Sequence, residues 1–256
     1  MKKFVLGIKI DDININQALQ IVKGWLKKEG KYYIVTPNPE IIVMAQKDEE
    51  FKNILNKANL SIPDGIGLKL SGDIVCNTPG IDLLESIIKM AADLGYTTGF
   101  LGGRDTVAEK SAECLKKKYP KLKVSFASSA GEIDNDGNEM GVLNHESRMM
   151  NQEKKQKKHN SLFIIPDSDI LFVAFGPPKQ EKWIAKNLDK IPVKLAMGVG
   201  GAFDFLSGKV PRASVWIRKM GLEWLFRLII QPWRIKRQLS LIKYIWLLLL
   251  DRMRTK

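Results

Sequence analysis

Residues able to accept a proton or to bind phosphate and hydroxyl oxygens follow two short apolar runs in this chain. Thr36 and Asn38 supply a hydroxyl and an amide within the segment Thr36-Pro37-Asn38-Pro39-Glu40. Asp64, in Pro63-Asp64-Gly65-Ile66-Gly67, is a carboxylate that can act as a general base if it faces a pocket. The structural alternatives are a proline-rich turn in the first segment and an Asp-Gly turn in the second.

A glycine pair, Gly102-Gly103, stands between an apolar run and a helical pattern. Bare backbone N–H groups and a helix N-terminus can hold a phosphate there, although a structural turn explains the same pair. The pair is neither a Walker loop nor a complete G-x-G-x-x-G fingerprint, and Gly65-Ile66-Gly67 and Gly198-Val199-Gly200 also lack the third glycine. These patterns disfavour an enzyme that uses a dinucleotide.

Gln180 and Glu181 open an expected helix, where Glu181 alternatively does no more than complement the helix dipole. The two histidines, His145 and His159, both lie in a polar, lysine-rich stretch over residues 137–160. A solvated helix or a loop is the default interpretation of such a stretch, to which we assign no function. Histidine-based catalysis is therefore disfavoured.

Two Asp-x-Asp sequences raise the question of a divalent metal. Asp134-Asn135-Asp136-Gly137 has the composition of a turn. Asp167-Ser168-Asp169 precedes an expected strand, so it lies at the rim of the sheet opposite to bound ligands. We therefore expect no metal and no cofactor, and assign the balancing of negative charge to arginines, backbone N–H groups and helix N-termini.

Short β-branched runs alternate with helical patterns, which predicts an α/β fold with a mostly parallel sheet. Ligands gather at the carboxyl ends of parallel strands, and the segments named above follow such strands. Asn14, Asp82 and Asp105 are expected helix caps. The expected strands are Phe4–Ile10, Tyr32–Thr36, Leu60–Ile62, Thr98–Leu101, Lys123–Ala127, Ile170–Ala174 and Lys194–Val199. The expected helices are Ile15–Lys28, Glu40–Lys47, Glu50–Lys57, Ile81–Leu94, Thr106–Lys118 and Gln180–Leu188.

The end of the chain differs in composition from the rest. From Arg212 onward there are eleven Lys/Arg against two acidic residues, four of the six tryptophans and the run Leu247-Leu248-Leu249-Leu250. Cations that meet anionic head groups, together with Leu and Trp that meet acyl chains, predict a helical membrane-binding appendage. We place a core over residues 1–212 and this appendage over 213–256, with a helix break at Pro232.

Other interpretations of the appendage explain less. A transmembrane helix needs about 20 apolar residues, and the run from Leu239 to Leu250 is shorter and contains Lys243. Nucleic acid attracts the charge but gives no reason for the leucines. Packing in a homo-oligomer stays open. The two cysteines lack metal-ligand spacing and the N-terminus lacks a cleavable signal, so we expect a cytoplasmic protein, peripheral on the inner face of the cell membrane.

Taken together, several segments resemble the WecG/TagA/CpsF glycosyltransferases, an N-acetylmannosaminyltransferase family of teichoic-acid and surface-polysaccharide synthesis. The resemblance is carried by segments that occur in order along the chain. They are Thr36-Pro37-Asn38-Pro39-Glu40, Pro63-Asp64-Gly65-Ile66-Gly67, Pro79-Gly80-Ile81-Asp82-Leu83, Phe100-Leu101-Gly102-Gly103, Gly176-Pro177-Pro178-Lys179-Gln180-Glu181-Lys182-Trp183, Gly198-Val199-Gly200-Gly201-Ala202-Phe203-Asp204 and Gly221-Leu222-Glu223-Trp224-Leu225.

The resemblance implies a Rossmann-like fold and a metal-independent, inverting transfer of a sugar. The donor would be UDP-N-acetylmannosamine, and the acceptor an N-acetylglucosamine linked to polyprenyl diphosphate. Asp64 would take the proton from the acceptor hydroxyl. Thr36, Asn38 and Gln180 would line the sugar and diphosphate region.

The same resemblance assigns the nucleotide to Gly102, Gly103 and Asp204. Family arginines spaced seven and then three residues apart would bind the diphosphate of the lipid acceptor or of the departing UDP. Here they are Arg227, Arg234 and Arg237.

The chain also departs from the family pattern. Many members carry an arginine shortly before the Pro-Gly-x-Asp-Leu segment, where this chain has Cys76-Asn77-Thr78. Arg104 or an appendage arginine would have to replace it. This loss keeps open the alternative of an inactive membrane-bound protein that binds nucleotide sugars. Nothing in the sequence fixes the sugar, so another UDP-sugar donor, such as a glucosyl or uronic-acid sugar, also stays open.

Overall fold

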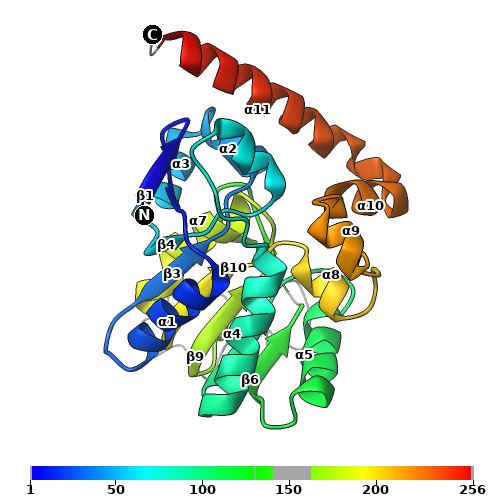
Figure 1. The fold of residues 1–256 in the computed structure, drawn as a ribbon. Coiled ribbons are helices and arrows are strands. Elements are labelled where there is room, and N and C mark those ends of the chain that lie inside the picture. Colours follow the sequence, from blue (N-terminus) through cyan, green and yellow to red (C-terminus); the bar gives the residue numbers. More distant parts are fainter. Residues whose placement is uncertain (1, 130, 141–162, 255–256) are drawn as a thin grey trace.

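The computed structural model describes residues 2–129, 131–140 and 163–254, without the side chains of 236–238 and 254. Its main sheet consists, in the described part, of six parallel strands in the order β4-β3-β10-β9-β5-β6 (Figure 1). The expected parallel α/β sheet is therefore confirmed. The strands are β3 (Tyr32–Val35), β4 (Leu60–Ser61), β5 (Thr97–Leu101), β6 (Lys123–Ser128), β9 (Ser168–Val173) and β10 (Val193–Gly198).

Helices cover both faces of the sheet, each with an apolar side. Residues of α1, α4 and α5 pack with Ile34, Phe100 and Phe172 in one core, and α7 packs its Trp183 and Ile184 in a second core on the opposite face. Burial of these apolar side chains is the main stabilising term for such layers. The helices are α1 (Ile15–Leu26), α4 (Gly80–Leu94), α5 (Val107–Lys118) and α7 (Lys179–Asn187).

The prediction of one strand over Phe4–Ile10 was wrong. The chain forms an antiparallel hairpin of β1 (Lys2–Val5) and β2 (Ile8–Asp11). Leu6 and Gly7 turn it with φ of 50° and 76°, and the leucine concealed the turn because such residues rarely adopt positive φ. A second hairpin, β7 (Glu132–Ile133) with β8 (Glu139–Met140), was not expected.

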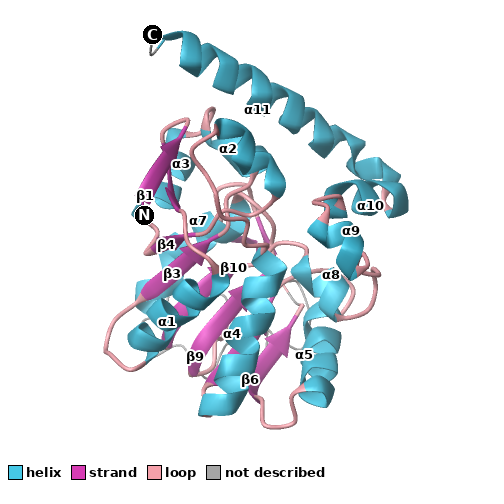
Figure 2. Ribbon diagram, viewed as in Figure 1, coloured by secondary structure: helices cyan, strands magenta, loops and turns pink. Residues whose placement is uncertain are grey.

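The appendage is helical along its described length (Figure 2). The expected break at Pro232 is confirmed, and Gly221, with φ of 74°, lies at a further break. Among the described residues, none of the helices combines the length and apolar content that crossing a bilayer requires. Its elements are α9 (Val215–Lys219), α10 (Glu223–Ile230), η3 (Pro232–Arg234) and α11 (Ile235–Arg254), and the short helix α8 (Ala202–Leu206) precedes them in the core.

The last helix, α11, lies across the end of the molecule next to α2 (Figure 1). Its Tyr244 and Leu248 are buried in a third apolar cluster with Ile8 and Ile10 of the hairpin. This cluster joins the two ends of the chain. Its remaining elements are α2 (Pro39–Ala45), α3 (Glu49–Lys57) and the short 3₁₀ helix η1 (Ile66–Ser71).

Of the three expected helix caps, only Asn14 caps a helix. Asn14 caps α1 in a reciprocal capping box with Gln17, as predicted. Asp82 is not a cap, because α4 already begins at Gly80, and its carboxylate is bound by arginine side chains instead. Asp105 has φ of 53°, stands before Thr106, the residue that precedes α5, and pairs with Lys209 at 2.8 Å.

The two Asp-x-Asp sequences lie as the sequence predicted. Asp134 accepts backbone hydrogen bonds from Asp136 at 2.9 Å and Asn138 at 2.8 Å, which makes the first sequence a turn. The second flanks Ser168 at the amino end of β9. Of the polar stretch 137–160, residues 141–160, with both histidines, lie outside the described residues.

The buried hydroxyl of Tyr244 yields a stability prediction. It has no hydrogen-bond partner among the described residues, and the side chain is 0% exposed. Tyr244→Phe should raise the free energy of unfolding by up to about 1 kcal/mol, because an unpaired buried hydroxyl is costly. Urea unfolding measures the change. Tyr33→Phe is the matched control: its hydroxyl donates to the Ile54 carbonyl at 2.7 Å, and its loss should cost about 1 kcal/mol. A loss of stability in Tyr244→Phe would contradict the prediction.

Candidate active site

A cavity of about 1150 Å³ lies at the carboxyl ends of the strands. Its walls come from the segments after β3, β4, β9 and β10, from the start of α4, and from η1 and α9 to α11. Distant parts of the chain thus meet where parallel sheets usually hold ligands. The predicted site residues that line it are Thr36, Asn38, Asp64, Gln180, Arg227 and Arg234.

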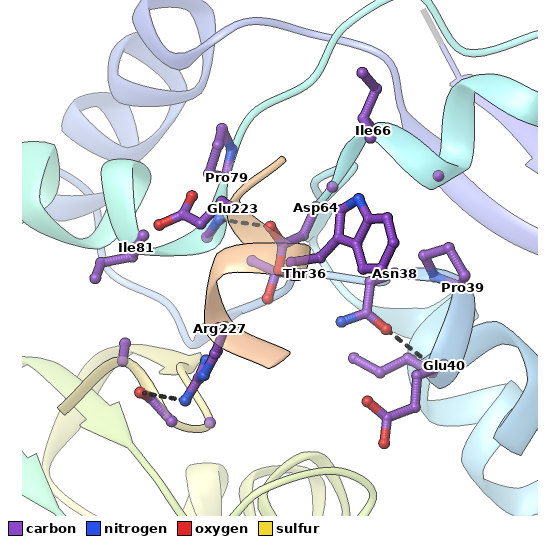
Figure 3. Close-up of a pocket in the computed structure, with 18 of the residues that line it drawn as sticks. Thr36, Asn38, Pro39, Glu40, Asp64, Ile66, Pro79, Ile81, Glu223 and Arg227 are labelled. Atoms are coloured by element: carbon purple, nitrogen blue, oxygen red, sulfur yellow. Dashed lines mark hydrogen bonds between the residues drawn. The ribbon is translucent and has the colours of Figure 1, made fainter. Parts of the chain in front are cut away.

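Asp64 stands on the loop that follows β4. Its backbone N–H donates to the Pro37 carbonyl at 2.9 Å, which ties this loop to the one after β3. Its Oδ1 accepts the Gly80 N–H at 3.1 Å, and its other oxygen has no hydrogen-bond partner among the described residues (Figure 3). The carboxylate is therefore fixed through one oxygen and has the other for a ligand.

The surroundings make Asp64 a stronger base than an ordinary aspartate. Burial raises its pKa to about 6, and the neighbouring carboxylates of Glu223 and Asp82 add to the rise. The hydrogen bond from Gly80 and the Arg227 guanidinium oppose it. A carboxylate with this pKa is still ionised at neutral pH and accepts a proton more readily, as a general base must.

Thr36 and Asn38 are close to this carboxylate (Figure 3). The Thr36 hydroxyl has no hydrogen-bond partner among the described residues, and a side chain at Gly80 would come within 3.2 Å of it. Asn38 caps α2, since its Oδ1 accepts the Ile41 N–H at 3.0 Å. The cap fixes the amide so that its NH₂ group is left to donate to a ligand. The proline-rich segment thus begins a helix, in place of the turn considered from the sequence, and also forms part of the cavity wall.

Gln180 acts within the protein as well as lining the cavity. Its Oε1 accepts the N–H groups of Gly176 at 3.1 Å and Gly200 at 2.9 Å, so it joins the loops after β9 and β10. Its Nε2 donates to Glu181 at 2.7 Å. Glu181 is 1% exposed, and burial raises its pKa to about 7. Glu181 therefore orients the amide of Gln180, a role the sequence did not suggest.

The appendage contributes Arg227 to the cavity. Its guanidinium lies 4.4 Å from the centre of the Phe205 ring, 3.6 Å from Asp204 Oδ2 and 3.4 Å from the Gly201 carbonyl. Arg234 lines the same cavity, while the side chain of Arg237, on α11, lies outside the described residues.

The residues assigned to the nucleotide are less directly placed. Gly102 and Gly103 adopt φ of 91° and 89° after β5, but neither is among the residues that line the cavity. Asp204 is not among them either and reaches the site through Arg227. Their nucleotide role stays a prediction.

Sequence reasoning missed an ionic cluster that forms part of the cavity wall, which we call the Arg212 bridge (Arg212, Asp82 and Glu223). Arg212 contacts Asp82 Oδ1 at 2.6 Å and Glu223 Oε1 at 3.0 Å. It thereby fixes α10, and with it Arg227 one turn later, against the start of α4. A signal existed: Glu223 is the only acidic residue between Arg212 and Leu250, and a lone acid in a basic segment indicates a specific partner.

Most of the chain is similar in sequence to known proteins. Residues 4–256 match the model of the Glycosyl transferase WecG/TagA/CpsF family. The chain is similar to the N-acetylglucosaminyldiphosphoundecaprenol N-acetyl-beta-D-mannosaminyltransferase of Bacillus subtilis (strain 168), with 30% identity over 87% of this chain and 80% of that protein. The protein of the same name from Staphylococcus aureus (strain MRSA252) is 29% identical over 93% of this chain and 88% of its own length. The protein therefore belongs to the WecG/TagA/CpsF family of glycosyltransferases.

Proposed function

We propose that this protein transfers N-acetylmannosamine, with inversion, from UDP-N-acetylmannosamine to N-acetylglucosamine linked to polyprenyl diphosphate. The names of the similar proteins support this donor and acceptor. The observation that carries the proposal is the Asp64 carboxylate, with its pKa raised to about 6, facing a cavity that the appendage arginines share. The product would serve teichoic-acid or surface-polysaccharide synthesis.

The chemistry needs a single base. The acceptor hydroxyl oxygen attacks the anomeric carbon of the donor, the bond from that carbon to the UDP oxygen breaks, and the hydroxyl proton passes to Asp64. Thr36 and Asn38 orient the sugar or the diphosphate with neutral hydrogen bonds. Negative charge gathers on the departing UDP, and Arg227 and Arg234 balance it.

The reaction is expected to proceed without a metal. The described residues contain no group of three or more His, Cys, Asp or Glu side chains placed to hold an ion. Turnover in the presence of EDTA tests this expectation directly.

The direct test of the proposed function is UDP release from UDP-N-acetylmannosamine with a short-chain lipid-diphosphate-N-acetylglucosamine acceptor. UDP-glucose and the UDP-linked uronic acid of N-acetylmannosamine run in parallel. Turnover only with UDP-N-acetylmannosamine supports the proposal. Turnover only with another donor would show that the enzyme transfers that donor's sugar instead. UDP binding with no turnover on any donor would make the chain a nucleotide-sugar binder.

The appendage also brings the enzyme to the inner membrane surface, where a polyprenyl-linked acceptor resides. Its apolar side chains are exposed in unusual number for a protein surface. Trp216, Trp233 and Trp246 are 64%, 71% and 56% exposed. On α11, Leu239 and Ile242 are exposed while Tyr244 is buried, so this helix has a protein face and an apolar outer face.

Membrane binding should depend on the exposed tryptophans. The triple variant Trp216→Ser, Trp233→Ser, Trp246→Ser should lose at least about tenfold in vesicle affinity per tryptophan, given the apolar area that each would bury. Co-sedimentation with vesicles of equal parts phosphatidylglycerol and phosphatidylcholine measures the loss. Phe4→Ser, at a site 64% exposed on the hairpin, is the matched control. Equal binding by the triple variant and the wild type would refute this membrane face.

A further inference from the structure

Two groups of cationic side chains reach the cavity, from different parts of the appendage. Arg218 and Lys219 come from the end of α9, whereas Arg227 and Arg234 come from α10 and η3. The two groups contact different parts of the core. Arg218 faces Asp82 at the start of α4, at 3.5 Å, and Arg227 faces Asp204 and Gly201 beyond β10.

Arg218 has hydrogen-bonding capacity that the protein does not use. Its Nε is buried and has no hydrogen-bond partner among the described residues, and the same holds for Nη2 of the adjacent Arg212. The same Asp82 oxygen contacts Arg212 at 2.6 Å and Arg218 at 3.5 Å, so one carboxylate is shared between two guanidinium groups. Arg218 also lines the cavity, so its guanidinium is placed to meet an anion there, and phosphate oxygens accept charged hydrogen bonds well.

Arg218 and Lys219 of α9 lie where the cavity opens onto apolar surface. Ile66 and Leu70 of η1 and Val215 of α9 line the cavity and are 42%, 50% and 57% exposed. Gly221, two residues after Lys219, packs so closely on Ile66 that a side chain there would come within 2.5 Å of it. Cations next to an apolar outlet match a ligand that joins a diphosphate to a hydrocarbon chain.

The Arg227 group has different surroundings. Its guanidinium lies over the Phe205 ring and beside Asp204, within the loop and helix that follow β10. In the view of Figure 3, Asp64 stands between Ile66, on the apolar side, and Arg227. A base in that position can reach an acceptor hydroxyl supplied from one side and a donor supplied from the other.

We infer that Arg218 and Lys219 bind the diphosphate of the prenyl-linked acceptor while Arg227 binds the diphosphate of the UDP-sugar, so that the cavity holds two diphosphates at once. The prenyl chain leaves over Ile66 and Leu70. This inference rests on the proposed function and extends it, because it divides the cations between the two substrates.

Equilibrium binding of two probes to the full chain tests the inference without any turnover. The probes are UDP and farnesyl diphosphate, a short prenyl diphosphate, with farnesol as the control for the hydrocarbon alone. In the wild type, saturating UDP should leave farnesyl diphosphate binding in place. The double variant Arg218→Gln, Lys219→Gln should weaken the binding of farnesyl diphosphate by about tenfold to a hundredfold, as expected for the loss of charged hydrogen bonds. It should weaken the binding of UDP by less than about twofold. Arg227→Gln should instead weaken the binding of UDP and leave the binding of farnesyl diphosphate nearly unchanged.

Two further variants separate binding from folding and from net charge. Arg218→Lys with Lys219→Arg preserves both charges and should retain most of the farnesyl diphosphate affinity. Lys116→Gln removes a cation from the exposed face of α5 and should change neither affinity. Competition between UDP and farnesyl diphosphate in the wild type would overturn the inference, as would equal weakening of both probes in the double variant. No wild-type affinity for farnesyl diphosphate would also overturn it. These results are independent of the sugar-transfer assay, so either proposal can fail alone.

Discussion

Replacing Asp64 by asparagine should reduce kcat by about two to four orders of magnitude while leaving UDP affinity unchanged. The size of the loss is that expected for a general base in proton transfer. The shape of the side chain and its hydrogen bond from Gly80 are preserved, since the asparagine carbonyl oxygen accepts the same N–H. Steady-state rates with both substrates saturating would give kcat, and calorimetric titration would give the UDP affinity.

The pH dependence gives the same assignment a second test. With a pKa of about 6 for Asp64, log kcat/KM of the wild type should fall by one unit per pH unit below pH 6 and level off above it. The folded-state pKa is raised above the ordinary value near 3.9, so ionised Asp64 lowers stability, progressively between about pH 4 and 6 and fully above. Asp64→Asn should therefore raise Tm at pH 7 and lose that gain near pH 4. A variant with wild-type turnover would exclude Asp64 as the base.

Replacing Arg227 by glutamine should reduce kcat by about two to three orders of magnitude. The guanidinium lies where the departing UDP would gather charge, and removal of one well-placed donor to a developing anion costs about this much. Stacking of Arg227 on Phe205 at 4.4 Å holds the group in place before a ligand arrives. The measurement is kcat with both substrates saturating, which separates the loss from weaker binding.

Two variants sharpen this result. Arg227→Lys keeps the charge but loses the planar fork, and should recover only part of the rate. Glu223→Gln keeps Arg227 but weakens the ion pair between residue 223 and Arg212 that holds α10 in place, and should lower the rate. It should also lower the pKa of Asp64, because the Glu223 carboxylate contributes to the rise of that pKa. If Arg227→Gln changed only the KM for the donor, the guanidinium would serve ground-state binding alone.

The sequence predicted the sheet and most helices because their apolar periodicity is local. The six strands of the main sheet, and the helices α1 to α5 and α7, lie within a few residues of their expected bounds. The prediction for the N-terminal hairpin was wrong for a specific reason. Leu6 adopts φ of 50°, and nothing in a leucine side chain announces a turn, so two short strands read as one.

The candidate site could be predicted only in part, for a related reason. Thr36, Asn38 and Asp64 follow strands, and parallel strands bring such residues together in any fold of this class. The Arg212 bridge depends instead on how α9 and α10 fold back over α4. Asp82 begins a helix in sequence and therefore looked like a cap, but its real partner is 130 residues away. Local patterns carry no information about such a contact.

The strand order of the main sheet has a consequence for protein synthesis. β9 and β10 occupy its centre, yet they are translated after every other strand of that sheet. Until residues 168–198 have left the ribosome, β3 and β5 have no partner strand on their inner edges, and unpaired edges promote aggregation. Closure must await late, non-local pairing, which is intrinsically slow. The nascent chain thus has no complete sheet until residue 198 is made and no complete site until the appendage follows, so the apolar helices of the appendage emerge only after the last strand of the sheet.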